Sequence, residues 1–175
     1  MAKWAYDMAR LCLMFILSMV KILFVCLGNI CRSPMAESIF NNLLNTQDLA
    51  TEFACDSAGT SNYHIGENAD KRTISTLTTK KLDIPSKARQ ITLQDLNHFD
   101  YIIAMDKNNY EDIQAMRPDK PLNKLYLLLT FYDKASDKDV PDPYYGAQDD
   151  FHTLYELLRA SLESFLAYLR KKHTK

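Results

Sequence analysis

The chain has 175 residues, enough for one domain with a hydrophobic core. Hydrophobic residues make up 47% of it and charged residues 25%, proportions that exclude a disordered or fibrous chain and indicate an ordinary globular protein. The formal net charge of −1 gives no general attraction for nucleic acid or for an anionic membrane, so any anion must be bound locally.

Residues 1–18 differ in character from the rest of the chain. An apolar run from Leu11 to Val20 resembles the hydrophobic part of a signal peptide, but no cleavage site of small residues follows it. Lys21 interrupts the run before it reaches the length of a membrane span. Because the sequence from Met19 onward reads like a natural start, we expect residues 1–18 to be an N-terminal extension or a misassigned start. A targeting or membrane segment and an additional packing helix are the alternatives.

A loop with the character of an anion site follows the first predicted strand. The strand is the apolar run Ile22–Val25, a helical pattern begins at Met35, and between them lies Cys26-Leu27-Gly28-Asn29-Ile30-Cys31-Arg32-Ser33-Pro34. Consecutive backbone N–H groups of such a loop can surround one dianion in front of a helix N-terminus. The same field favours the thiolate of Cys26, and Arg32 can bind the anion through two parallel hydrogen bonds. The loop therefore predicts a site for phosphoryl transfer.

Strands and helices alternate along the rest of the chain. The helix from Met35 ends near Asn45, with Pro34 in its first turn and Ser33 as its cap. The other expected strands are Glu52–Ser57, Asp100–Met105 and Leu125–Leu129, and the other expected helices are Asn68–Lys81, Leu93–Phe99, one running from a cap at Asp106 to about Arg117, and Asp149–Lys172. Asp106 is expected to cap this helix; its alternative role is an ion pair with Arg32.

This alternation predicts an α/β fold. We expect a single-domain, four-stranded parallel sheet with helices on both faces and the phosphate-binding loop after strand 1, formed by residues 19–175. Ligands of such sheets bind beyond the carboxyl ends of the strands. Cys26, Ser57 and Met105 lie at the predicted carboxyl ends, so the loops that follow them are expected to converge.

A second, rigid loop offers a proton donor. In Val140-Pro141-Asp142-Pro143-Tyr144-Tyr145-Gly146, two prolines bracket Asp142 and restrict the backbone on both sides of it. Hydrolysis of a phosphate ester needs a nucleophile, positive charge around the phosphate oxygens and a proton for the leaving oxygen. Cys26, Arg32 and Asp142 can supply these, while Tyr144 and Tyr145 are suitable walls for a flat ring.

With these two motifs the chain resembles the low-molecular-weight protein tyrosine phosphatase family. The resemblance runs from about Val20 to Tyr168, and it also includes Asp56-Ser57-Ala58-Gly59-Thr60 and Ala88-Arg89-Gln90. It implies hydrolysis of phosphotyrosine and small aryl phosphates through a phosphocysteine on Cys26, with Arg32 clamping the phosphate and Asp142 acting as general acid and base. It also implies tyrosine-phosphorylated proteins as substrates, and neither a metal nor another cofactor.

The resemblance implies supporting roles as well. Asn29, Ser33 and Ser57 would hold the loop in shape, whereas Leu27, Tyr63, Tyr144 and Tyr145 would line the entrance for the substrate ring. Cys31 would form a reversible disulfide with Cys26 that protects it from further oxidation. Many members of the family carry a histidine shortly before Ala-Arg-Gln, where this chain has Ser86.

Three other functions compete with this interpretation. An arsenate reductase of the same fold needs further cysteines, but none follows Cys55. A related arginine phosphatase would have threonine in place of Ile30. A phosphotyrosine-binding module would need neither the nucleophile nor the acid.

The four cysteines, Cys12, Cys26, Cys31 and Cys55, have neither the spacing of a zinc site nor the number of a disulfide framework. Together they favour a reducing, cytoplasmic setting.

Removal of residues 1–18 tests the interpretation of the N-terminus. We expect the chain that begins at Met19 to fold and to hydrolyse aryl phosphates like the full chain, because strand 1 and its loop are retained. Soluble yield, circular dichroism and phosphatase rate are the measurements. A truncated chain that no longer folds would show that the segment belongs to the domain.

Overall fold

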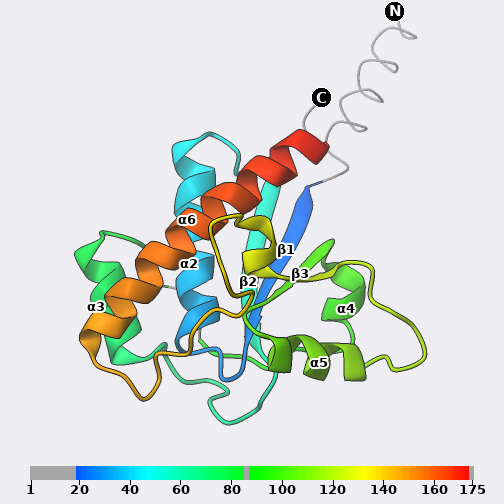
Figure 1. The fold of residues 1–175 in the computed structure, drawn as a ribbon, viewed down its shortest axis with the longest axis horizontal. Helices are drawn as coiled ribbons and strands as arrows, with labels where there is room; N and C mark the ends of the chain where they lie inside the picture. Colours follow the sequence, from blue (N-terminus) through cyan, green and yellow to red (C-terminus); the bar gives the residue numbers. More distant parts are fainter. Residues whose placement is uncertain (1–18, 85–86, 174–175) are drawn as a thin grey trace, which may run out of the picture.

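A four-stranded parallel sheet forms the centre of the molecule (Figure 1). The computed structural model describes residues 19–84 and 87–173. The strands are β1 (Val20–Cys26), β2 (Phe53–Gly59), β3 (Tyr101–Ala104) and β4 (Leu125–Leu127), and their order in the sheet is β2-β1-β3-β4. Residues 1–18 and Ser86 lie outside the described residues. The structure therefore does not test the expected N-terminal extension, or the effect of a serine where many family members carry a histidine.

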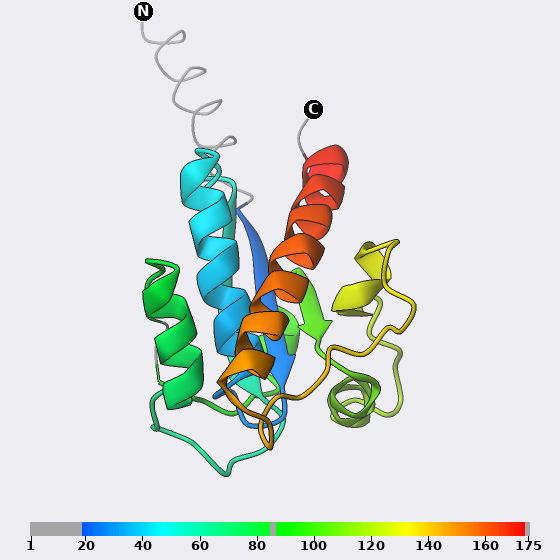
Figure 2. The same cartoon turned by 60° about the vertical axis from the view of Figure 1, so that its left-hand side comes forward.

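Helices cover both faces of the sheet, as predicted (Figure 2). One face carries α2 (Arg32–Thr46), α3 (Lys71–Thr79), the short 3-10 helix η1 (Leu128–Phe131) and the long α6 (Gln148–His173). The other carries α4 (Asp95–His98) and α5 (Lys107–Ala115). None of the helices in the two described ranges is long and apolar enough to cross a membrane.

Burial on both faces explains why the central strands are almost continuously apolar. In β1, Ile22 and Phe24 belong to the core beneath α2 and α6, whereas Leu23 and Val25 belong to the core beneath α4 and α5. The apolar positions of α6 follow helical spacing and are buried against the sheet, among them Phe151, Leu154, Leu158, Leu162, Phe165 and Leu169. These packed layers fix β1 and the loop that follows it.

Strand order places that loop at the topological switch point of the sheet. From β1 the chain moves to β2 on one side and then returns past β1 to β3 on the other side. The crevice beyond the carboxyl end of β1 is where ligands of open parallel sheets bind. The expected convergence of loops is thus confirmed by the topology.

Some predicted boundaries are wrong for local reasons. The helix expected over Asn68–Lys81 begins at Lys71, because the extended Asp70 caps it by accepting a hydrogen bond from Arg72 N at 2.8 Å. The strand expected over Leu125–Leu129 ends at Leu127, because the 3-10 helix η1 begins at Leu128.

At two further places the expected ends differ from the structure. β2 continues beyond Ser57 to Gly59, which pairs with Cys26 in the sheet register. Ser33 does not cap α2, because it is the second residue of the helix; the cap position is Cys31, which makes no side-chain capping bond.

Gly59 allows the close approach of β2 to the loop after β1. A Cβ atom at this position would lie 2.6 Å from Leu27 O and 3.1 Å from Asn29 N, both backbone atoms. Gly59→Ala must therefore displace the loop, and we expect it to lower the free energy of unfolding by about 1–3 kcal/mol. Urea denaturation measures the change.

Gly66→Ala is the matched control. An added Cβ there meets no atom within 4 Å, but the positive φ of 83° should still cost about 1 kcal/mol. If Gly59→Ala were no more destabilising than this control, the predicted clash between a Cβ at this position and the loop would be wrong.

Candidate active site

Cys26 is the last residue of β1, and its side chain lies at the base of the loop with 3% of its surface exposed. Asn29 N donates a hydrogen bond to Cys26 Sγ at 3.3 Å, and Ser33 Oγ lies 3.1 Å from the same sulfur. Ser33 Oγ also lies 3.2 Å from Ala58 O. Because a hydroxyl has one proton, Ser33 can donate to the sulfur or to the carbonyl, but not to both. A thiolate at Cys26 would draw that proton to the sulfur.

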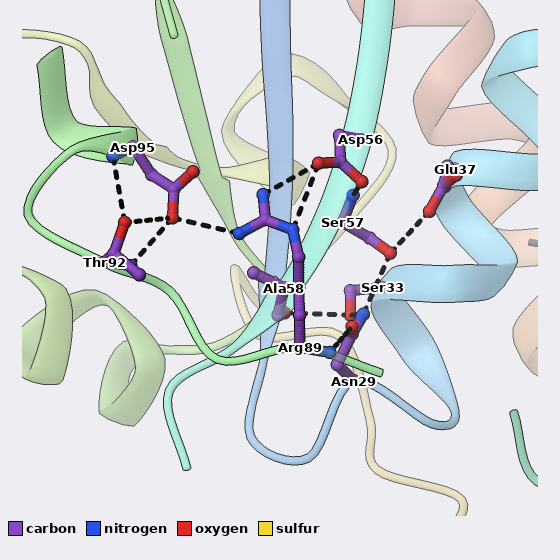
Figure 3. Close-up of polar contacts among 9 residues, drawn as sticks. All are labelled: Asn29, Ser33, Glu37, Asp56, Ser57, Ala58, Arg89, Thr92 and Asp95. Carbon is purple, nitrogen blue, oxygen red and sulfur yellow. Dashed lines mark hydrogen bonds and ion pairs between the residues drawn. The ribbon is translucent and has the colours of Figure 1, made fainter. Parts of the chain in front are cut away.

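Asn29 connects the loop to three other segments. Its Nδ2 donates to Ser33 Oγ and to Ser57 Oγ, each at 2.9 Å, and its Oδ1 accepts from Arg89 N at 2.9 Å (Figure 3). The φ of Asn29 is 54°, in the left-handed region that asparagine tolerates better than most residues. Since both ends of the amide are bound inside the fold, the loop conformation is fixed by its surroundings.

Two charged residues that the sequence analysis did not select stand behind this network (Figure 3). Ser57 Oγ donates to the buried carboxylate of Glu37, and Arg89 pairs with Asp56 at 2.8 Å and with Asp95 at 3.0 Å. Arg89 is part of the Ala-Arg-Gln match, which carried no assigned role. For Glu37, the only sign in the sequence was its position: it is an acidic residue one helical turn after Ser33.

Arg32 is 3% exposed, and its guanidinium presents one edge for binding an anion. Nη1 donates to the Asp106 carboxylate and, at 3.2 Å, to Val140 O, while Nη2 donates to Asp142 Oδ2 at 2.6 Å. Nε is buried, and it has no hydrogen-bond partner among the described residues. Because Nε and Nη2 share one edge of the guanidinium, they are arranged as a fork that could donate two hydrogen bonds to an anion such as phosphate.

The charge of Arg32 is balanced by its neighbours. Burial alone would lower its pKa, but Cys26, Asp142 and Asp106 raise the pKa above its ordinary value, so the guanidinium stays charged. Asp106 performs both of the roles considered for it, because it also caps α5 by accepting from Asn109 N at 2.7 Å. The Arg32 guanidinium thus pairs with Asp106 and also with Asp142, which lines the pocket described below.

The N-terminus of α2 adds to the positive potential of the loop. This helix has no side-chain cap and no acidic residue in its first turn, so nothing in the helix neutralises the positive end of its dipole. An anion above Cys26 would lie against that end. The local structure therefore favours negative charge where the sequence predicts a phosphate.

An open pocket of about 330 Å³ lies above Cys26. It brings together most of the predicted site residues: Cys26, Leu27, Gly28, Ile30, Cys31, Arg32, Tyr63, Asp142, Tyr144 and Tyr145. Asn29, Ser33 and Ser57 do not line the pocket; they lie behind the loop in the network described above.

His64 also lines the pocket, although the sequence analysis assigned it no role. Its Nδ1 lies 2.7 Å from Glu67 Oε2, and its ring packs against Gly28, where an added Cβ would meet it at 2.9 Å. The sequence could have suggested this place for His64, because it directly follows Tyr63, which was predicted to line the entrance.

Cys31 and Cys26 are both free thiols in this structure. Burial, with Asp70 and Cys26 nearby, raises the pKa of Cys31 to about 12, which keeps it protonated. The reversible disulfide between the two cysteines stays a prediction.

Comparison with known proteins gives a consistent picture. The profile of the family described as low molecular weight phosphotyrosine protein phosphatase matches residues 21–175. The human low molecular weight phosphotyrosine protein phosphatase is 39% identical over 153 residues, which cover 87% of this chain and 95% of the human protein. The low molecular weight protein-tyrosine-phosphatase YfkJ of Bacillus subtilis is 39% identical over 155 residues, which cover 88% of this chain and 98% of YfkJ.

Solved structures show the same fold for proteins with different described activities. The crystal structure of YfkJ superposes with a TM-score of 0.84 at 40% identity, covering 89% of this chain and 97% of YfkJ. A crystal structure described as a Drosophila arginine phosphatase superposes with a TM-score of 0.79 at 34% identity, covering 86% of this chain and 98% of that one.

Glu37 should make stability depend on pH. Burial raises its pKa from 4.5 to about 7, although the hydrogen bond from Ser57 acts in the opposite direction. The folded state therefore holds this proton more tightly than the unfolded state. The contribution of Glu37 to stability should be fully present below about pH 4.5, fall as the pH rises towards 7, and then level off, with a total loss on the order of 3 kcal/mol.

Glu37→Gln should remove this slope, as measured by urea denaturation between pH 5 and pH 8. Glu163→Gln, at a half-exposed carboxylate on α6, is the matched control and should leave the slope as it is. A Glu37→Gln protein with the wild-type pH slope would contradict the raised pKa.

Proposed function

This chain belongs to the low molecular weight phosphotyrosine protein phosphatase family, and we propose that it hydrolyses phosphotyrosine through a phosphocysteine formed on Cys26. The observation that carries the proposal is the position of Asp142. It is 110 residues from Arg32 in the sequence, yet it pairs with that buried arginine at the rim of the pocket that contains Cys26. A nucleophile, an anion clamp and an acid thus share one pocket.

In the first step, the thiolate of Cys26 attacks the phosphorus atom of the ester. The Nε and Nη2 edge of Arg32, together with the backbone N–H groups of the loop, holds the phosphoryl oxygens. As the S–P bond forms and the P–O bond to the phenol breaks, protonated Asp142 gives its proton to the leaving oxygen. The products of this step are the free phenol, phosphocysteine and the Asp142 carboxylate.

In the second step, water releases the phosphate. The Asp142 carboxylate takes a proton from the water as its oxygen attacks phosphorus, and the S–P bond breaks to return the thiolate. Ser33 supports both steps, because its hydroxyl can donate to the sulfur whenever the sulfur is negatively charged.

Substrate binding must release the contact between Arg32 and Asp142. The Asp142 side chain is 42% exposed, so water can solvate its carboxylate once the contact with Arg32 is released. A phosphate dianion, which can accept from both Nε and Nη2, competes favourably for the same edge. Asp142 then becomes available to the leaving oxygen.

The walls of the pocket favour an aryl ester. Leu27, Tyr63, Tyr144 and Tyr145 are exposed by 44%, 75%, 40% and 98%, an unusual concentration of exposed apolar surface at one opening. Such surfaces stack on a flat ring, so phosphotyrosine in proteins is the expected substrate. Ile30 contributes an apolar side chain to the same pocket, which gives a phosphoarginine guanidinium no hydrogen-bond acceptor.

The proposed chemistry sets conditions for activity. Arg32 and the loop provide the positive charge around the phosphate, so the reaction should proceed in the presence of a chelator. The nucleophile must stay reduced, which favours a reducing compartment such as the cytoplasm.

Cys26→Ser tests the covalent step. A serine hydroxyl is scarcely ionised at neutral pH, so we expect hydrolysis of phosphotyrosine peptides to fall by at least about 1,000-fold. Acid-quenched wild-type protein should carry one phosphoryl group on Cys26 by mass spectrometry. The same peptides with phosphoserine or phosphoarginine should be poor substrates.

Cys55→Ser is the matched control, because Cys55 lies in β2 outside the pocket, and it should keep most of the activity. Substantial turnover by Cys26→Ser would refute the covalent mechanism. Tight binding of phosphotyrosine with no release of phosphate by the wild-type protein would instead indicate a binding module.

A further inference from the structure

The loop that carries Asp142 is held by a second arginine, which the proposed chemistry does not use. Arg72, near the start of α3, donates from Nη1 to Gly146 O at 2.7 Å and from Nη2 to Tyr144 O at 3.0 Å. Its guanidinium carbon also lies 4.4 Å from the centroid of the Phe151 ring in α6. Arg72 therefore fixes the far end of the acid loop against two helices.

Arg72 is itself rigidly oriented by Asp70. Its Nε and Nη2 donate to the two carboxylate oxygens of Asp70, at 2.9 Å and 2.8 Å. Asp70 N in turn donates to Ile30 O, in the phosphate-binding loop, at 2.8 Å. A continuous path of hydrogen bonds thus leads from the phosphate-binding loop, through Asp70 and Arg72, to the acid loop.

The segment that Arg72 holds is the one that orients the acid. Pro143 to Gly146 form a turn closed by the bond from Gly146 N to Pro143 O at 2.8 Å. Inside this turn, Tyr144 N donates to Asp142 Oδ1 at 3.1 Å. Arg72 binds the carbonyl oxygen of Tyr144, so it fixes the residue whose N–H holds the Asp142 carboxyl group.

The contact of Arg72 with Tyr144 should affect the orientation of Asp142 most when substrate is bound. Within residues 19–84 and 87–173, Asp142 has two polar contacts: Oδ2 with Arg32 at 2.6 Å and Oδ1 with Tyr144 N. The proposed reaction gives the Arg32 contact to the phosphate. The bond from Tyr144 N then orients the acid towards the leaving oxygen, and its geometry depends on the turn that Arg72 clamps.

We propose that Arg72 is a positioning residue that holds Asp142 in line with the leaving oxygen through the turn Pro143–Gly146. The inference rests on the proposed function, because it takes Asp142 as the general acid. Arg72 does not line the pocket above Cys26, so we expect it to touch neither the substrate nor the reacting atoms. Its contribution should therefore appear only where the reaction needs a proton from Asp142.

The test compares leaving groups. Nitrophenyl phosphate has a leaving group that departs without a proton, whereas phenyl phosphate and phosphotyrosine peptides need one. For Arg72→Ala we expect kcat/KM to fall roughly 10-fold to 100-fold with phenyl phosphate, part of the contribution of a general acid, but by no more than about 3-fold with nitrophenyl phosphate.

A double-mutant cycle separates positioning from a general structural effect. Asp142→Ala should show the same selective loss with phenyl phosphate, only larger. If Arg72 acts through Asp142, Arg72→Ala should add little to Asp142→Ala, because the two effects share one group. Arg72→Lys, which keeps the charge but not the planar fork, should fall between Arg72→Ala and the wild type.

Two measurements guard against loss of folding. Arg159→Ala removes an exposed arginine of α6 that pairs with Glu156 and Glu163, so it is the matched control and should behave like the wild type. Inhibition by inorganic phosphate should be unchanged in Arg72→Ala if the phosphate-binding loop is intact.

The outcomes are distinguishable. A selective loss in both Arg72→Ala and Asp142→Ala, without further loss in the double variant, supports the inference. A selective loss in Asp142→Ala alone, an equal loss with both substrates, or additive losses in the double variant would overturn it. If Asp142→Ala showed no selectivity, the assignment of the acid would fail first.

Discussion

The loop around Cys26 depends on one asparagine held in a backbone conformation that most side chains avoid. The left-handed φ of Asn29 costs about 1 kcal/mol, whereas its three side-chain hydrogen bonds contribute about 0.5–1.5 kcal/mol each. The bonds therefore outweigh the strain. Their partners belong to α2, to β2 and to the segment around Arg89. The loop is thus preorganised for an anion, which is what electrostatic stabilisation of a transition state requires.

The buried charge of Arg32 explains why two aspartates approach it in different ways. A buried guanidinium without a counter-charge would be strongly destabilising, so a permanent partner is needed. Asp106, only 17% exposed and also the cap of α5, is that partner. Asp142 is 42% exposed and lies on a loop, so it can leave without exposing an uncompensated charge. Burial therefore distinguishes the two partners of Arg32: the more buried Asp106 is suited to a permanent ion pair, and the more exposed Asp142 to one that can be exchanged.

The sequence was sufficient for the architecture but not for the network behind the loop. Alternating apolar strands and amphipathic helices specify a parallel sheet with covered faces, and the glycine-containing loop after β1 marks its switch point. The partners of Glu37 and Arg89 could not be predicted, because their contacts join segments that only the folded chain brings together. Ser33 illustrates the same limit: its type suits a helix cap, but its place beside Cys26 gives its hydroxyl a different partner.

The loop that carries Asp142 is held at two points, and the proposed reaction would affect only one of them. Near its beginning, Arg32 contacts Val140 O and the Asp142 carboxylate; near its end, Arg72 contacts the carbonyl oxygens of Tyr144 and Gly146. In the proposed reaction a phosphate would compete for Arg32 Nη2, whereas Arg72 does not line the pocket and would keep its contacts with the backbone. The backbone around Asp142 can therefore stay in place while its side chain changes partner. An acid that moves by side-chain rotation alone pays little conformational entropy during the reaction, which is the advantage of placing it between two fixed arginines.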